Sequence, residues 1–136
     1  MPVVTFRIPA ARATDARCER LLVQGSALFA KLLQSPPERI RAFVEVYEAG
    51  RMAVGGQLSA DAGAAFFECY VLAGRPQQQR HALLAAFNDL LATTLDIDPA
   101  VIRGACIPVA PEDWGIAGRP ASAIRSAEIA QRAAQG

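Results

Sequence analysis

Apolar residues in the first part of the chain follow the pattern of a strand, a helix and a second strand. Residues 3–8 and 40–47 are rich in Val, Phe and Ile, which is typical of strands. Between them, apolar residues recur at intervals of three and four, which predicts a helix with one buried face. Thr14 is placed to cap the start of this helix, and Ser35-Pro36-Pro37 ends it.

The same order of elements returns after a passage of small and polar residues at positions 57–63. Residues 65–72 and 101–109 have the composition of strands. Between them, Gly74-Arg75-Pro76 opens a second helix, with proline at its first position, and Asp98-Pro99 ends it. The chain therefore contains two strand–helix–strand segments.

The two halves correspond residue by residue, which indicates an internal duplication. Arg12 matches Arg75, 63 positions later, and Ile40-Arg41 matches Ile102-Arg103, 62 positions later. The difference of one indicates an insertion in a connection. Each β-α-β unit is expected to form a parallel strand pair with a right-handed crossover. We therefore predict an α+β fold whose four-stranded sheet is mainly parallel-paired, with both helices on one face.

Length and composition suit one domain over residues 1–136, made of repeats 1–56 and 64–120 and a tail, 121–136. The strands are apolar on both faces, so the sheet face without helices needs a cover. The tail is rich in Ala, helical or frayed, and has little apolar bulk. We therefore expect other copies of the chain to cover that face, in a closed homo-oligomer.

Charge and cysteine usage exclude several classes of function. The net charge is +1 and no basic block is visible, which argues against nucleic-acid binding. Three cysteines without metal-type spacing indicate free thiols in a reducing compartment. One histidine and no clustered carboxylates give no support to a metal site or a catalytic triad. Without a signal peptide or a membrane-length apolar run, the chain is expected to be cytoplasmic, with no membrane partner.

The candidate chemistry lies at Met1-Pro2. Removal of Met1 would leave Pro2 with a free secondary amine at the head of a strand. An α-amino group titrates near ~7.7–8.0, and burial or a cationic neighbour lowers its pKa toward neutrality. If Met1 is retained, the nitrogen is a tertiary amide without basicity. A small residue after Met1 also permits methionine removal in many unrelated proteins, so the rest of the chain decides the weight of this dipeptide.

The motifs that surround this dipeptide resemble those of the tautomerase superfamily. The Met-Pro start lies on a strand, an arginine precedes each helix, an arginine starts each second strand, and residues 114–118 read Trp-Gly-Ile-Ala-Gly. The 4-oxalocrotonate tautomerase group has one such unit per chain. In the macrophage migration inhibitory factor and cis-3-chloroacrylic acid dehalogenase groups, two units are fused and three chains form a ring. The resemblance implies a homotrimer that needs no cofactor.

The resemblance also implies roles for five residues. Pro2 would be the catalytic acid and base, and Arg75 would bind the carboxylate of a small substrate. Arg41 or Arg103 would bind the far carboxylate or carbonyl, and oligomer geometry decides which of the two lines the pocket. Trp114 would wall the pocket of the proline. The implied activity is a cofactor-independent tautomerase or isomerase of a 2-oxo or enol carboxylic acid.

Two alternatives remain open at the level of sequence. The first is a related activity that depends on Pro2: decarboxylation, hydration or dehalogenation. Ile116 stands where the dehalogenases carry a water-activating acid, and Ala73 stands where the decarboxylases carry a second arginine, so both branches are disfavoured. The second alternative is an inactive trimeric binding protein of the same fold.

Overall fold

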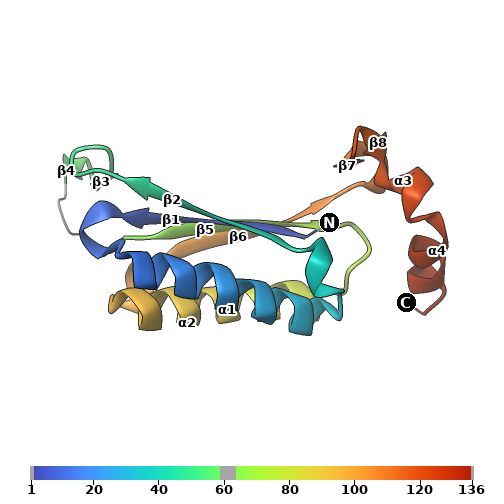
Figure 1. The fold of residues 1–136 in the computed structure, drawn as a ribbon, viewed down its shortest axis with the longest axis horizontal. Coiled ribbons are helices and arrows are strands. Elements are labelled where there is room, and N and C mark those ends of the chain that lie inside the picture. The colour runs from blue at the N-terminus through green and yellow to red at the C-terminus, as the bar shows by residue number, and fades with distance from the viewer. Residues whose placement is uncertain (1, 59–63, 136) are drawn as a thin grey trace.

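Two β-α-β units form one mixed sheet in the computed structural model, which describes residues 2–58 and 64–135 (Figure 1). The first unit contains β1 (Val3–Pro9), α1 (Asp15–Leu33) and β2 (Arg41–Tyr47). The second unit contains β5 (Phe66–Leu72), α2 (Gln77–Leu95) and β6 (Arg103–Val109). Short 3-10 turns connect these elements, namely η1 (Ala10–Arg12), η2 (Pro37–Arg39), η3 (Pro99–Val101) and η4 (Pro111–Asp113).

Each unit is followed by a small hairpin, and the two hairpins lie at opposite ends of the molecule (Figure 1). The first pairs β3 (Ala53–Val54) with β4 (Gln57–Leu58), and the second pairs β7 (Gly115–Ile116) with β8 (Arg119–Pro120). The chain then continues into α3 (Ala121–Ile124) and α4 (Ser126–Gln135). The tail is therefore helical, and it lies beyond one end of the sheet rather than over its uncovered face (Figure 1).

The strand order is β2-β1-β5-β6, with parallel pairs inside each unit and an antiparallel pair where the units meet. This arrangement confirms the predicted α+β fold with both helices on one face. Val3 pairs with Tyr70 and Arg7 with Phe66, so the two units run in opposite directions. As a result, Pro2 and its duplicate position, Ala65, lie at opposite ends of the sheet.

The ends of the helices follow local capping rules. Thr14 accepts a hydrogen bond from the Arg17 backbone N–H at 3.3 Å, as expected for an N-cap. The α2 helix begins one residue later than predicted, because Pro76 is its N-cap. Both helices end on a residue with left-handed backbone, Gln34 and Asp96, which occupy equivalent positions of the two units.

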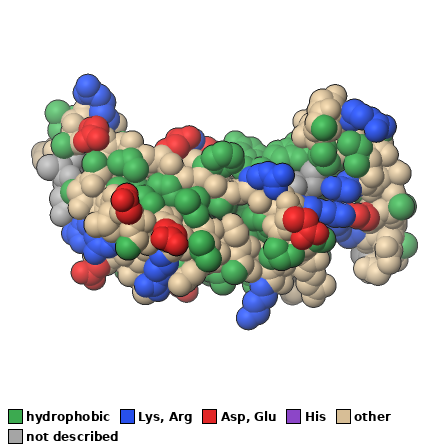
Figure 2. Space-filling view, viewed as in Figure 1, with side chains coloured by type: hydrophobic (Ala, Val, Ile, Leu, Met, Phe, Trp, Pro, Cys, Tyr) green, Lys and Arg blue, Asp and Glu red, His purple; other side chains and the backbone are tan. Residues whose placement is uncertain are grey.

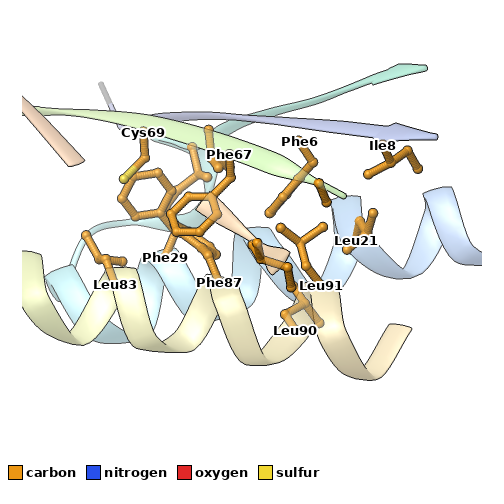
Figure 3. Packing of buried hydrophobic residues seen from close by; sticks show 14 of the residues in the cluster. Phe6, Ile8, Leu21, Phe29, Phe67, Cys69, Leu83, Phe87, Leu90 and Leu91 are labelled. Atoms are coloured by element: carbon orange, nitrogen blue, oxygen red, sulfur yellow. The ribbon is translucent and has the colours of Figure 1, made fainter. Parts of the chain in front are cut away.

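The core lies between the sheet and the two helices, and Phe87 of α2 is at its centre (Figure 3). Its ring makes edge-to-face contacts with Phe6, Phe29 and Phe67 at centroid distances of 5.5, 5.3 and 5.6 Å. The ring of Phe67 also fills the space that a Cβ atom at Gly104 would occupy. This cluster joins both units in one core.

The opposite face of the sheet carries apolar residues beside a charged network. Phe43 is 53% exposed there, and Phe66 is 37% exposed. Arg7 bonds Glu45 at 2.9 Å and Glu68 at 2.7 Å, which links the three neighbouring strands. None of the described helices covers this face (Figure 1). In the described part of the chain, no helix has the length and hydrophobicity needed to cross a membrane.

Candidate functional site

Pro2 is buried at the start of β1, beside the ends of α1 and β5. Its carbonyl oxygen accepts a hydrogen bond from the Arg41 backbone N–H at 3.0 Å, which holds it against the start of β2. Pro2 lines a cavity of about 20 Å³. Four arginines and one carboxylate line the same cavity, namely Arg39, Arg75, Arg125, Arg132 and Glu128. Met1 lies outside the described residues, so its removal stays a prediction.

The structure brings Arg75 to Pro2 within one chain. Arg75 Nη1 donates to the Leu33 carbonyl oxygen at the end of α1, at 2.6 Å. Burial, and then repulsion from Arg132, lower the pKa of Arg75 to about 10, while Glu128 acts in the opposite direction. The Arg75 guanidinium is half-buried, and the nearby carboxylate of Glu128 does not fully offset the effects of burial and of Arg132 on its pKa.

The equivalent arginine of the first unit makes the equivalent contact at the other end. Arg12 Nη1 donates to the carbonyl oxygens of Leu95 and Asp96 at the end of α2, at 3.3 and 3.2 Å. In both units, the arginine between the first strand and the helix therefore bonds the end of the other unit's helix. The segment between this arginine and its own helix is one residue longer in the first unit. Only the Arg75 end also contains the chain start.

An ion pair closes the side of the Pro2 cavity that faces the C-terminal helix. Arg39 of η2 donates to both carboxylate oxygens of Glu128 of α4, at 2.9 and 3.0 Å. These hydrogen bonds hold the pKa of Glu128 below its usual value of 4.5. The guanidinium Nε of Arg125 is buried and has no hydrogen-bond partner among the described residues.

Arg41 and Arg103 lie at opposite ends of the sheet. The Arg41 backbone N–H donates to the Pro2 carbonyl oxygen at 3.0 Å, so Arg41 lies at the Pro2 end. The Arg103 backbone N–H donates to the Ala65 carbonyl oxygen at 3.1 Å, so Arg103 lies at the other end. Both side chains are exposed, and both bond the carbonyl oxygens of the preceding 3-10 turn. Within one chain, Arg41 is therefore the nearer of the two to Pro2, and the pocket that each faces in an oligomer stays a prediction.

Trp114 lies near the Pro2 end but on the uncovered face of the sheet. Its ring is 6.2 Å from that of Tyr70, and Tyr70 pairs with Val3, the residue after Pro2. The Trp114 carbonyl oxygen accepts a hydrogen bond from the Ala121 backbone N–H at 2.8 Å, which ties the second hairpin to α3. Trp114 is not among the described residues that line the Pro2 cavity, and its role as a wall stays a prediction.

A larger cavity of about 690 Å³ occupies the opposite end of the sheet, at the duplicate position. Ala65, Arg103, Arg51, Met52 and Phe66 are among its lining residues. An internal residue has no free amine, so this cavity lacks the base that Pro2 would supply. Among residues 2–58 and 64–135, no group of three or more His, Cys, Asp and Glu side chains is placed to hold a metal ion.

Comparison with known proteins places this geometry in a familiar fold. No protein-family model and no curated protein matches the chain. A fused 4-OT solved as a wild-type symmetric trimer matches it with a TM-score of 0.81 and 25% identity, over 90% of this chain and 98% of that one. The chain has the fused 4-OT fold.

Two other neighbours agree with this assignment. A protein solved after inactivation by 2-oxo-3-pentynoate has a TM-score of 0.83 and 22% identity, over 90% of this chain and 98% of that one. The macrophage migration inhibitory factor of Toxoplasma gondii has a TM-score of 0.73 and 21% identity, over 87% and 98%. The resemblance to the tautomerase superfamily that the sequence motifs indicate is therefore confirmed for the fold.

The sequence motifs did not predict several charged residues that line the Pro2 cavity. Arg39 has no arginine at its duplicate position, where Val101 stands, and this difference between the halves was the available signal. The tail residues have no duplicate at all, and their role depends on where α4 lies. The missed residues are Arg39, Arg125, Glu128 and Arg132.

Proposed function

We propose that the chain is a cofactor-independent tautomerase of a small 2-oxo or enol carboxylic acid. The observation that carries this proposal is that buried Pro2 shares one cavity with Arg75 and three further arginines. Pro2 would act as acid and base, and Arg75 would bind the carboxylate of the substrate. The similarity to a fused 4-OT supports a tautomerase-type activity, and the roles of Pro2 and Arg75 are our inference.

The proposed chemistry needs one group that takes a proton and returns it. The Pro2 nitrogen would take the proton of the enol hydroxyl while the electron pair forms the carbonyl, and would then protonate carbon. Such a base works best when its pKa lies near the working pH. Burial and the neighbouring guanidinium groups lower the pKa of an amine, so they favour a neutral Pro2. Arginine suits the carboxylate because its planar fork donates two parallel hydrogen bonds.

We also infer that the chain forms a homotrimer in the cytoplasm. The fused 4-OT neighbour is a symmetric trimer, and Phe43 and Phe66 expose apolar surface on the uncovered sheet face. In that assembly, Arg41 or Arg103 would bind the far end of the substrate, and Trp114 would wall the pocket. Each of these placements depends on contacts between chains.

The test begins with the intact mass of the protein, which should show that Met1 is absent. Phenylpyruvate and 2-hydroxymuconate are then the probe substrates. We expect Pro2→Ala to lower kcat/KM by about hundredfold or more, because a positioned acid–base group contributes roughly 10²–10⁴. Pro36→Ala, at an exposed proline, is the matched control and should keep wild-type rates.

Covalent labelling gives a second readout at the same residue. One neighbour of this fold was inactivated by 2-oxo-3-pentynoate. We expect this reagent to add to Pro2 once per chain, and peptide mass spectrometry should find slower labelling of Pro2→Ala, whose terminal amine is primary. Unchanged probe substrates and an unlabelled, free Pro2 would contradict the tautomerase assignment.

A second candidate is an inactive binding protein of the same fold, because the small cavity at Pro2 leaves a substrate no room beside the proposed base. A volume of about 20 Å³ leaves room for little more than a water molecule. Binding of phenylpyruvate with no turnover by protein that carries a free Pro2 would select this candidate.

A further inference from the structure

The C-terminal helix α4 lies at the same end of the molecule as the chain start (Figure 1). Its anchor is α3, where Ala121 is fully buried and bonds Trp114. The Arg39–Glu128 ion pair then joins α4 to η2, across 89 positions of the chain. Through these contacts, α4 supplies one wall of the Pro2 cavity.

Positive charge around the Pro2 cavity as a whole exceeds negative charge. The cavity is lined by four arginines and a single carboxylate, Glu128. Figure 2 shows basic side chains gathered beside acidic ones between the body of the molecule and the C-terminal helix. Arg39 holds both oxygens of Glu128, and Arg125 and Arg132 make no ion pair within the described part of the chain. The pKa of Arg75 is lowered first by burial and then by repulsion from Arg132, which is one of these arginines.

A second chamber adjoins the Pro2 cavity. It has a volume of about 410 Å³, and Arg75 and Arg132 line both spaces. Gln79 also lines the chamber, and its side-chain oxygen is buried without a hydrogen-bond partner among the described residues. A chamber of this size lies within the range of small-molecule sites, roughly 300–1,000 Å³. Arg75 and Arg132 therefore line both the ligand-sized chamber and the small cavity at Pro2.

We propose that the C-terminal segment 125–135 is part of the substrate site. Arg125, which precedes α4, and Arg132 of α4 join Arg75 in binding the carboxylate of a small organic acid, and Glu128 occupies the place of that carboxylate on Arg39 until substrate arrives. The identity of the ligand as a substrate rests on the proposed function. Displacement of Glu128 frees α4 to shift, and the small cavity at Pro2 then opens to the adjoining chamber.

The test measures binding separately from turnover. Phenylpyruvate is titrated calorimetrically into full-length Pro2→Ala protein, in which a primary amine replaces the secondary amine of the proposed base and turnover is expected to be slow. Arg125→Gln and Arg132→Gln together should raise Kd by about tenfold or more, because hydrogen bonds between charged groups are stronger than those between neutral groups. Glu128→Gln should lower Kd, because it removes the internal carboxylate that competes for Arg39. Thermal unfolding of each variant checks that it is folded.

Two exposed residues of α1 provide matched controls. Arg20→Gln and Glu19→Gln remove the same charges far from α4 and should leave Kd unchanged. A wild-type Kd in the double arginine variant overturns the proposal. So does weaker binding in Glu128→Gln, because Glu128 would then only hold the helix in place. A lack of phenylpyruvate binding to the parent protein overturns it as well.

The two proposals fail in different ways. If wild-type protein with a free Pro2 converts neither probe but the Kd pattern appears, the α4 site stands and the tautomerase assignment falls. If turnover depends on Pro2 but the arginine variants keep wild-type KM and Kd, the tautomerase assignment stands and the α4 site falls.

Discussion

Pro2 and Ala65 occupy equivalent positions in the two units, but only Pro2 can carry a free backbone amine. Each carbonyl oxygen accepts a hydrogen bond from the backbone N–H of an arginine that starts the adjacent parallel strand. Only the start of a chain can carry a free backbone amine, so fusion of the units leaves one position of this kind per chain. The duplicated end keeps its arginine and its cavity but has no base.

Among the described glycines, Gly104 has the least room for a side chain. It pairs with Phe67 in the sheet, and a Cβ atom would overlap the Phe67 ring. We expect Gly104→Ala to lower the free energy of unfolding by about 1–3 kcal/mol, the usual cost of overpacking. Urea denaturation of the purified variant measures the loss.

Gly115 is the matched control for this prediction, since a Cβ atom there meets no other atom within 4 Å. Gly115→Ala should change the free energy of unfolding by no more than about 0.5 kcal/mol. Equal stability of the two variants would show that Phe67 repacks at no cost.

At the scale of elements, α4 is held by a carboxylate and is therefore sensitive to acid. Hydrogen bonds from Arg39 lower the pKa of Glu128, so the ion pair stabilises docked α4 fully above the ordinary value of 4.5. This stabilisation is lost as pH falls through the lowered pKa. We expect the amide protection factors of α4 to fall as the pH drops below 4.5 and through the lowered pKa of Glu128, while those of α1 stay unchanged.

A substitution at Arg39 tests whether loss of the Arg39–Glu128 ion pair, rather than another effect of acid, lowers the protection of α4. Arg39→Gln should give α4 at pH 7 the low protection that wild-type protein shows once Glu128 is protonated in acid. Protection of α4 that is the same at both pH values in the wild type would mean that other contacts hold the helix.

At the scale of the whole molecule, the uncovered sheet face is the surface that assembly would bury. Phe43 is 53% exposed there, on the edge strand β2. We expect wild-type protein to sediment as a trimer, and Phe43→Glu to sediment as a smaller species, because a carboxylate would be buried without a partner.

Val23 gives the matched control for assembly. It is 63% exposed on α1, in the helix layer on the other side of the sheet, so Val23→Glu should remain a trimer. Circular dichroism should show that both variants are folded. A trimer that survives Phe43→Glu would place the interface elsewhere.

Signals that lie along the chain could be read from the sequence by itself. The apolar periods, the caps and prolines, and the offsets of 62 and 63 predicted two β-α-β units with both helices on one face. They could be read because turns, caps and amphipathic faces depend on residues a few positions apart. The pairing of Pro2 with Arg75 came from the family motifs, and the structure brings the two residues into one cavity.

Contacts between distant residues could be read only from the tertiary structure. The antiparallel pairing of β1 with β5 places Pro2 and Ala65 at opposite ends, and it separates Arg41 from Arg103. The sequence of the tail shows scattered charge, yet Arg39 and Glu128 meet across 89 positions. No local pattern specifies such a contact, because it depends on the sheet placing the end of β6 at the same end of the molecule as the start of β1.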